Sequence, residues 1–401
     1  MPLVIAALVS FACSQDAPKP RPGQAHPDVD QARVDKAIER GAKFLLGKVD
    51  NFGEIEHPKE KGIGKDELVL LTLVHADVDP SNVSFQKLLD RVLDKRLAKT
   101  YEVSLLAMAL EALDRDTYRD HLANCAQWLA DNQCENGQWG YGEAIDLPPV
   151  KKPPQDVPTQ TGGAFTSDEE VIKLRKAAKG GSTKATKRII KRRKGPPSGD
   201  NSNSQYAALG VRACLRAGCE IETPVVARAL KWWLDTQQPD GGWHYGNSDL
   251  PGDRSWGSMT AGATSSVIIY LYWLKKDFRK NEPVARGMKW MADHFSVKEN
   301  PSFMVPTVFH YYWLYAVERV GMLFGTEKFG IREWYPEGAK LLLDAQRGSG
   351  SWDADRGGGG PGGGLLGGSL GGEVVDTCFA ILFLRRATAP LKPVASEDKK
   401  K

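Results

Sequence analysis

The sequence predicts an all-α protein whose helices close into a double-layered barrel, an α6/α6 (α/α) toroid. Two observations carry this prediction. A QxxxGxW motif occurs three times, each time after a helical pattern, and helical segments alternate between amphipathic and almost wholly apolar. The 401 residues, of which 41% are hydrophobic, suffice for a large buried core. We therefore expect one repeat-built domain rather than several separate ones.

Each copy of the motif places a glutamine, a glycine and a tryptophan at fixed spacing after a helix. The copies are Gln133, Gly137 and Trp139; Gln237, Gly241 and Trp243; and Gln346, Gly350 and Trp352. The last carbonyls of a helix need donors, and a glycine just beyond can adopt the left-handed conformation that ends a helix. The tryptophan can then fold back, with its indole N–H on a backbone carbonyl. We expect these nine residues to be structural.

The helical periodicity gives six hairpins. Their helices are 36–47 with 66–77, 84–96 with 101–114, 120–132 with 202–218, 225–237 with 261–276, 284–295 with 304–323, and 337–346 with 373–388. The second helix of each pair is the more apolar, as in SSVIIYLYWL (265–274). Helices that are apolar on most faces are buried, so these six should form an inner ring. Six such pairs favour a closed barrel over an open solenoid.

QxxxGxW turns on α-hairpins resemble the repeat of squalene-hopene cyclases, oxidosqualene cyclases and protein prenyltransferase β subunits. The chain is similar to bacterial prenyltransferase and squalene oxidase repeat proteins over roughly residues 36–388. The resemblance implies the fold far more strongly than an activity, because this fold hosts cyclases, transferases and non-enzymatic domains.

The acidic motifs of terpene cyclases are missing. Neither the DxDD acid motif nor the DDxxD motif that holds magnesium diphosphate occurs, and the GCGEQ thioester motif of complement-like toroids is absent as well. The nearest string, DADR at 353–356, follows a QxxxGxW turn and is better interpreted as surface. These absences argue against ordinary terpene cyclisation.

Asp376 and Cys378 resemble the Asp-x-Cys zinc-ligand pair of prenyltransferase β subunits. The family's third ligand is a histidine farther along the chain, and no histidine follows Cys378. His310, on another inner helix, could complete a zinc site that activates a thiol. Alternatively, Asp376 caps the last inner helix and Cys378 fills the core. These three are the candidate catalytic residues; we expect no cofactor, with zinc as the alternative.

Parallel inner helices would open their N-termini at one end of the barrel, forming a mouth that could receive an anion. The candidate ligand-binding residues there are Asn201, Asn203, Gln205 and Thr260, besides Asp376 and Cys378. His310 and Glu318 are eight residues apart on one helical face, so an acid/base pair is conceivable, although a buried structural histidine is the commoner case. His244 falls in a loop after a turn, where we expect exposure.

The N-terminus predicts export. Residues 1–13 (MPLVIAALVSFAC) read as a signal peptide or a lipoprotein signal, in which Cys13 would be a membrane tether. A disordered linker (14–33), the toroid (34–389) and a disordered tail (390–401) would follow. The expected location is the periplasm or cell envelope.

Two stretches interrupt the toroid: a Pro-rich and basic insertion at 143–199 and a Gly-rich loop at 357–372. Residues 171–194 hold eleven Lys or Arg and no acid, which leaves a net charge of −7 on the rest of the chain. This segment could attach to an anionic surface or a protein partner, or be a solvated loop. We expect no nucleic-acid partner. One disulfide, between Cys125 and Cys134, is conceivable.

Two classes of function remain. The first is an exported binding or scaffold module with no assignable reaction, which the missing motifs favour. The second is a divergent isoprenoid-handling enzyme, a cyclase or prenyltransferase-like protein that uses the barrel cavity. An enzyme should show a deep cavity with convergent polar groups, whereas a scaffold is expected to have its barrel filled by aromatic side chains.

Overall fold

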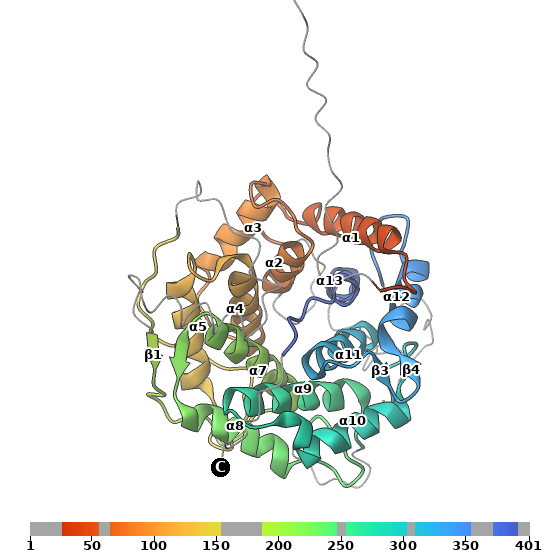
Figure 1. Cartoon of the computed structure of the whole chain (residues 1–401). Coiled ribbons are helices and arrows are strands. Elements are labelled where there is room, and N and C mark those ends of the chain that lie inside the picture. Colours follow the sequence, from red (N-terminus) through yellow and green to blue (C-terminus); the bar gives the residue numbers. More distant parts are fainter. Residues whose placement is uncertain are drawn as a thin grey trace, which may run out of the picture.

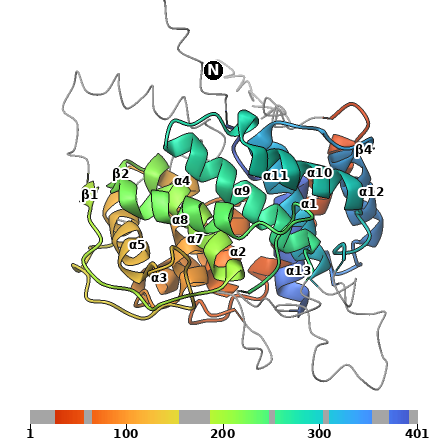
Figure 2. The same ribbon diagram turned by 90° about the horizontal axis from the view of Figure 1, so that it is seen from below.

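The computed structural model describes residues 26–55, 65–153, 187–246, 254–302, 309–353 and 372–391, and these contain twelve α-helices in two concentric rings (Figures 1 and 2). The outer helices are α1 (Gln31–Leu46), α3 (Val83–Asp94), α5 (Arg119–Asn132), α8 (Thr223–Asp235), α10 (Glu282–His294) and α12 (Trp334–Ala345). The inner helices are α2 (Lys65–His75), α4 (Thr100–Asp114), α7 (Asn201–Arg216), α9 (Gly257–Trp273), α11 (His310–Phe324) and α13 (Gly372–Arg385). The predicted all-α toroid is confirmed.

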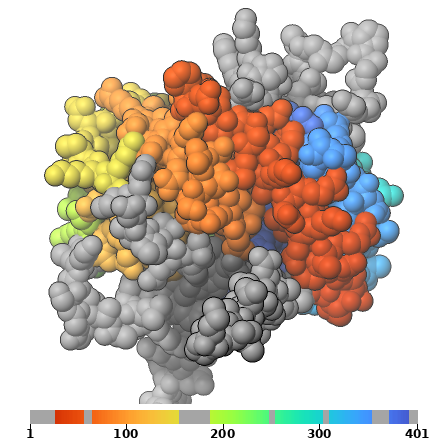
Figure 3. Space-filling view, turned by 90° about the horizontal axis from the view of Figure 1, so that it is seen from above, coloured from red at the N-terminus to blue at the C-terminus, as the bar shows by residue number. Residues whose placement is uncertain are grey.

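The inner ring is closed. Each inner helix packs against the next, from α2 through α4, α7, α9 and α11 to α13, and α13 packs against α2. The outer ring is closed as well, because the first outer helix, α1, contacts the last outer helix, α12, and also the inner helix α13. In Figure 3 the N-terminal and C-terminal segments accordingly lie side by side on the surface. Inner helices such as α9 are buried along nearly their whole length, whereas outer helices bury a single stripe.

The three tryptophans of the repeat hold the helix ends as their spacing predicts. The indole N–H of Trp139 donates to Leu129 O (2.8 Å), and those of Trp243 and Trp352 donate to carbonyls ten residues earlier. Each tryptophan backbone N–H donates to a hydroxyl in the first turns of an inner helix, which for Trp243 is that of Thr260 (3.1 Å). Every turn therefore fastens an outer helix to the inner helix that follows.

The three glutamines link neighbouring repeats. Gln133 Nε2 donates to Gly137 O (3.3 Å) within its turn and to Val225 O (2.8 Å) at the start of α8. Gln237 reaches α10 in the same way, and Gln346 reaches Ala37 O (2.8 Å) in α1. The third turn thus closes the ring between the last outer helix and the first.

The motif glycines allow the same close contact between neighbouring repeats. Gly137 has φ +97°, and the other two have φ +93°. A Cβ at Gly137 would lie 2.3 Å from Arg228 O in α8, and a Cβ on either of the other two would meet the next outer helix in the same way. A side chain here would therefore be strained and would also push the next repeat away.

The far end of the basic insertion is ordered against the toroid, which the sequence did not predict. Strand β1 (Lys187–Ile189) pairs in parallel with β2 (Cys219–Ile221). Lys191 Nζ donates to the carbonyls of Ala130 (3.0 Å) and Gln133 (2.7 Å) at the end of α5. Arg192 binds the buried carboxylate of Asp131, while Lys187 and Lys194 form ion pairs with exposed acids. Positive charge that we expected to be solvated instead caps a helix end.

Other differences from the predicted elements are local. Helix α1 begins at Gln31, inside the expected linker, because Asp30 caps it by accepting from the backbone N–H of Arg33 (3.1 Å). A short antiparallel hairpin forms between β3 (Lys328–Phe329) and β4 (Arg332–Glu333), and a 3-10 turn, η2 (Phe278–Lys280), precedes α10. Cys125 and Cys134 are both buried free thiols, so the conceivable disulfide is not formed.

Several predictions concern residues that the structure does not describe. They include the segment 1–13 with Cys13, the basic residues up to 186, the Gly-rich loop as far as 371 and the tail from 392. Within the described ranges, no helix combines the length and the hydropathy that a bilayer crossing requires.

Candidate functional site

One end of the barrel is closed by the chain that follows α13. Figure 1 shows residues 386–391 running from the end of α13 towards the centre of the rings. Thr388 donates from its backbone N–H (2.9 Å) and its hydroxyl (2.7 Å) to the carboxylate of Glu318 in α11. Arg212 of α7 donates to Ala389 O (2.6 Å). The segment therefore seals the end at which the inner helices finish.

A buried arginine lies inside the barrel. Arg319 of α11 is 1% exposed, and its guanidinium carbon lies 4.7 Å from the ring centre of Tyr315 and 5.4 Å from that of Tyr206. Nη2 donates to Gln205 Oε1 (2.9 Å). Among the described residues, the Nε and Nη1 groups of Arg319 and the hydroxyl of Tyr206 form no hydrogen bond of good geometry, although Arg319 lies close enough to the Tyr206 oxygen to act as a weak donor to it.

A layer of hydroxyl groups separates this arginine from the mouth. The Tyr101 hydroxyl is paired with that of Ser202 and lies 3.1 Å from that of Tyr312. Gln205 Nε2 donates to the Tyr312 hydroxyl (2.7 Å). Burial raises the pKa of Tyr101 well above its usual value, so this layer is neutral at physiological pH.

The rings of these residues fill the space between the inner helices. Tyr101 packs on Tyr206 (centroids 4.2 Å apart), and Phe379 of α13 packs on both Tyr312 (5.7 Å) and Tyr315 (5.6 Å). We call the set the axis cluster; its members are Tyr101, Ser202, Gln205, Tyr206, Tyr312, Tyr315, Arg319 and Phe379. It draws on α4, α7, α11 and α13, and it combines an aromatic filling with one buried cation.

Of the four predicted ligand-binding residues, Gln205 belongs to the axis cluster. Asn201 accepts from the Trp232 indole (2.8 Å) and donates to His244 O (2.8 Å), which ties α7 to the neighbouring turn. The Asn203 side chain donates to Asp200 (2.7 Å), which caps the same helix. The Thr260 hydroxyl accepts from the backbone N–H of Trp243 in the second QxxxGxW turn. These three side chains are engaged in the scaffold.

The candidate catalytic residues do not form a metal site. Asp376 and Cys378 are buried on α13, and burial raises the pKa of Cys378 to about 12, which keeps the thiol protonated. His310 is hydrogen-bonded through Nε2 to Val297 O (2.7 Å), and burial lowers its pKa. In the described parts of the chain, no group of three or more His, Cys, Asp or Glu residues is arranged to hold a metal ion.

Two further expectations about histidines need correction. His310 and Glu318 do not pair, because Glu318 accepts from Thr388 at the sealed end while His310 bonds at the start of α11. His244 is buried rather than exposed, since its carbonyl receives Asn201 and its Nδ1 accepts from Gly246 N (3.2 Å).

Sequence reasoning missed Arg319 and the tyrosines beside it. One signal was present: the adjacent charges Glu318 and Arg319 interrupt an inner helix that is otherwise almost entirely apolar (HYYWLYAVERVGMLF). Charged residues are almost never fully buried without a partner, so this pair within a predicted inner helix indicated an unusual site.

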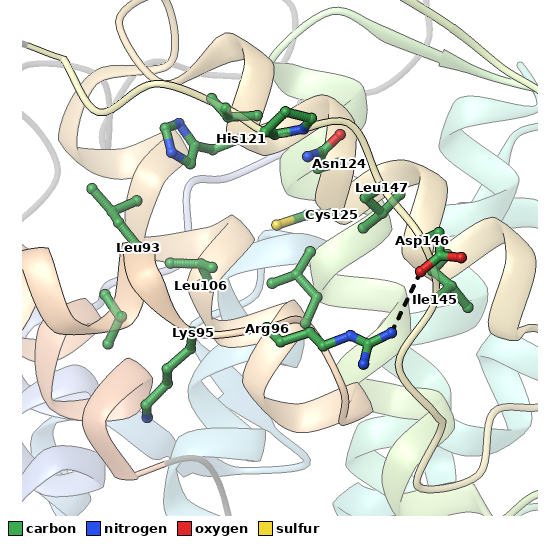
Figure 4. Close-up of a pocket in the computed structure, with 14 residues that line it drawn as sticks. Leu93, Lys95, Arg96, Leu106, His121, Asn124, Cys125, Ile145, Asp146 and Leu147 are labelled. Carbon is green, nitrogen blue, oxygen red and sulfur yellow. Dashed lines mark ion pairs between the residues drawn. The ribbon is translucent and has the colours of Figure 1, made fainter.

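A cavity lies in the outer layer, between α3, α4 and α5 (Figure 4). It has a volume of about 320 Å³ and is covered by residues 145–150. Asn124 donates to Pro148 O (2.8 Å), and Arg96 pairs with Asp146 (3.5 Å), which fixes the cover to the helices. Its lining is largely aliphatic, with Leu93 and Leu106 on the helices and Leu147 on the cover. Lys95, another lining residue, is engaged outside the cavity, in ion pairs with Asp66 and Glu67.

Comparisons with known proteins define the class of fold. No family model and no curated protein sequence matches the chain. Solved structures do: an apo variant of the type II terpene cyclase MstE from Scytonema has 11% identity and a TM-score of 0.52, covering 89% of this chain and 96% of that chain. Another MstE variant, in complex with geranylgeranyl dihydroxybenzoate, has 12% identity and a TM-score of 0.51, covering 89% and 97%.

A protein from Actinoplanes is also similar, with 15% identity, a TM-score of 0.50, and coverage of 88% of this chain and 99% of that chain. At such identities the likeness concerns the fold alone. The chain therefore has a terpenoid cyclase-like α/α-toroid fold, and its function must be argued from its own residues.

Proposed function

We propose that this protein is a binding module built on the α/α toroid, and not an isoprenoid cyclase or transferase. One observation carries the proposal: the guanidinium of Arg319 occupies the aromatic faces at the centre of the barrel. Cyclases use such faces to stabilise carbocations. A fixed positive charge between Tyr206 and Tyr315 would instead repel a carbocation at close range.

The packing of the barrel supports the same conclusion. A polyprenyl chain needs an apolar cavity along the axis. In the described residues that space holds the axis cluster, and the chain after α13 seals the end below it. The sequence also lacks the acid motif that would start cyclisation. Filling of the barrel by aromatic side chains is the feature expected of a scaffold.

The proposal is tested with the compound found in a similar structure. Cyclisation rearranges bonds without changing mass, so a product of geranylgeranyl dihydroxybenzoate would appear in liquid chromatography with mass spectrometry as a new peak of unchanged mass. We expect no such peak from this protein, with MstE as the positive control. A new peak that disappears when the protein is heat-denatured would overturn the proposal.

We further propose that the module works outside the cytoplasm. The support is the apolar run of residues 1–12 followed by Cys13. Cell fractionation and the mass of the mature N-terminus test this. Cleavage with a lipid on Cys13 indicates a tethered form, and cleavage without lipid indicates a released form. An intact Met1 in the cytoplasmic fraction would refute export.

A further inference from the structure

The buried guanidinium of Arg319 is incompletely satisfied. An arginine carries five N–H groups, and the three on Nε and Nη1 form no hydrogen bond of good geometry with the described residues. Only Nη2 is bonded, to a neutral amide oxygen. Unbonded polar groups at this depth are rare in folded proteins, and an unmatched charge costs more than an unmatched amide. Something other than the described side chains is therefore expected to meet these donors.

No carboxylate neutralises this charge directly. In the described part of the chain, Arg319 forms no ion pair, and its sequence neighbour Glu318 accepts instead from Thr388. Burial raises the pKa of Glu318 to about 7, so even this more distant carboxylate is only partly charged at neutral pH. The interior of the barrel consequently keeps a positive charge without a bound counter-charge.

The groups around the guanidinium suit an oxyanion. The Tyr206 O–H is a further donor without an acceptor among the described residues. Arg319, through its charge and a weak hydrogen bond to the phenol oxygen, lowers the pKa of Tyr206 against the stronger effect of burial. Gln205 and Tyr312 fix the neighbouring polar positions through their own hydrogen bond. Gly262 leaves room for Gln205, because a Cβ there would lie 2.1 Å from Gln205 Oε1.

We infer that Arg319 and Tyr206 form an anion-binding site inside the toroid, which takes a carboxylate or phosphate group small enough to fit among the side chains of the axis cluster. This inference rests on the proposed function, because it names the ligand class of the binding module. Guanidinium N–H groups and a phenol O–H are donors that carboxylate and phosphate oxygens accept from, and charge-assisted bonds of this kind are strong in a water-poor site.

The test measures thermal unfolding in sodium phosphate and, separately, sodium acetate, with ionic strength held constant by sodium chloride. Phosphate also stabilises proteins without a site by preferential exclusion, so the informative quantity is a saturable increase in Tm. We expect saturation with at least one anion for the wild type and none for Arg319→Met. Acetate alone would indicate a carboxylate ligand, and phosphate alone a phosphorylated one.

A matched pair of tyrosines provides the control. Tyr206→Phe and Tyr270→Phe each remove one buried, unpartnered hydroxyl, but no charged group shifts the pKa of Tyr270. We expect Tyr206→Phe to weaken anion binding about tenfold, because one hydrogen bond to a charged group is lost. Tyr270→Phe should respond to the anions as the wild type does. If Arg319→Met does not fold, this pair decides the question alone.

The inference is overturned if the wild type shows no saturable response to either anion, or if Tyr206→Phe and Tyr270→Phe respond equally. Those outcomes would not contradict the proposal that the protein is a binding module. Product formation from geranylgeranyl dihydroxybenzoate, in contrast, overturns the module and not the anion site, so the two failures are distinguishable.

Discussion

The QxxxGxW turns and the axis cluster are both buried and both contain large aromatic residues, but their polar groups are treated differently. In the turns, each glutamine Nε2, tryptophan indole and tryptophan backbone N–H donates to a partner in all three copies, although Gln237 Oε1 accepts from none of the described residues. In the axis cluster, a cation keeps unbonded donors. Paired donors are what a structural element needs, whereas unmet donors at a buried charge are typical of a site that receives a ligand.

The largest effect should come from opening a turn. Trp243 is fully buried, and Trp243→Ala removes its ring from the core and its indole bond to Trp233 O (3.0 Å). We expect the free energy of unfolding to fall by about 3–5 kcal/mol. Chemical denaturation measures this, with Phe52→Ala, an 82% exposed aromatic, as a control that stays within about 0.5 kcal/mol. Similar losses for both variants would refute the role given to the turns.

A pH dependence should separate the sealed end of the barrel from the turns. Burial raises the pKa of Glu318 to about 7, against 4.5 when unperturbed. Between these values the unfolded chain loses a proton that the folded protein keeps, so stability falls as pH rises from about 4.5 to 7. The pKa difference corresponds to a loss of about 3 kcal/mol in the free energy of unfolding. This loss is complete once Glu318 is ionised in both the folded and the unfolded protein.

Glu318→Gln should therefore be less sensitive to pH than the wild type, when unfolding is measured by urea denaturation at pH 5 and pH 8. Glu67 keeps part of the trend in both proteins, because burial raises its pKa to about 7 as well, with Lys95 opposing. Glu39→Gln, at an exposed position of α1, should follow the wild type. Identical pH profiles for Glu318→Gln and the wild type would contradict a buried, proton-retaining carboxyl group.

A smaller effect should distinguish copies of the same turn. Gln133 is fully buried, and Gln133→Ala leaves the carbonyls of Gly137 and Val225 without their donor. We expect a loss of about 1–3 kcal/mol. Gln237 Nε2 makes the equivalent bonds, but Gln237 Oε1 accepts from none of the described residues, whereas Gln133 Oε1 accepts from Arg228 (3.1 Å). Gln237 is also partly exposed, so water can replace its amide and Gln237→Ala should cost less. A larger loss for Gln237→Ala, measured in the same denaturation experiment, would show that burial does not set the strength of the turn.

The sequence predicted the turns well because the motif and the carbonyl that receives its indole lie within eleven consecutive residues. The helix end, the glycine and the tryptophan lie together in the chain, so the indole bond follows from spacing. The partner of each glutamine could not be predicted in this way: Gln133 reaches Val225, 92 residues later, and Gln346 reaches Ala37, 309 residues earlier. Those contacts depend on how the rings close.

The candidate site was predicted only in part. Gln205 was placed near the mouth from its position at the start of an inner helix, and it does lie against Arg319. Tyr101, Tyr312 and Arg319 come from two other inner helices, and nothing local in the chain brings them together. Asp376 and Cys378 attracted attention through a two-residue resemblance, which is too short to specify where a third ligand lies.

The most direct test of the contrast between the two regions is the stability of Arg319→Met after exhaustive dialysis against chloride. Burying a cation costs several kcal/mol, and one hydrogen bond with two ring contacts offsets a similar amount, while methionine fills the space. If the axis cluster is built for binding, the free energy of unfolding should change by less than about 1 kcal/mol or rise. A loss as large as that of Trp243→Ala would show that Arg319 holds the fold together, and would contradict the account.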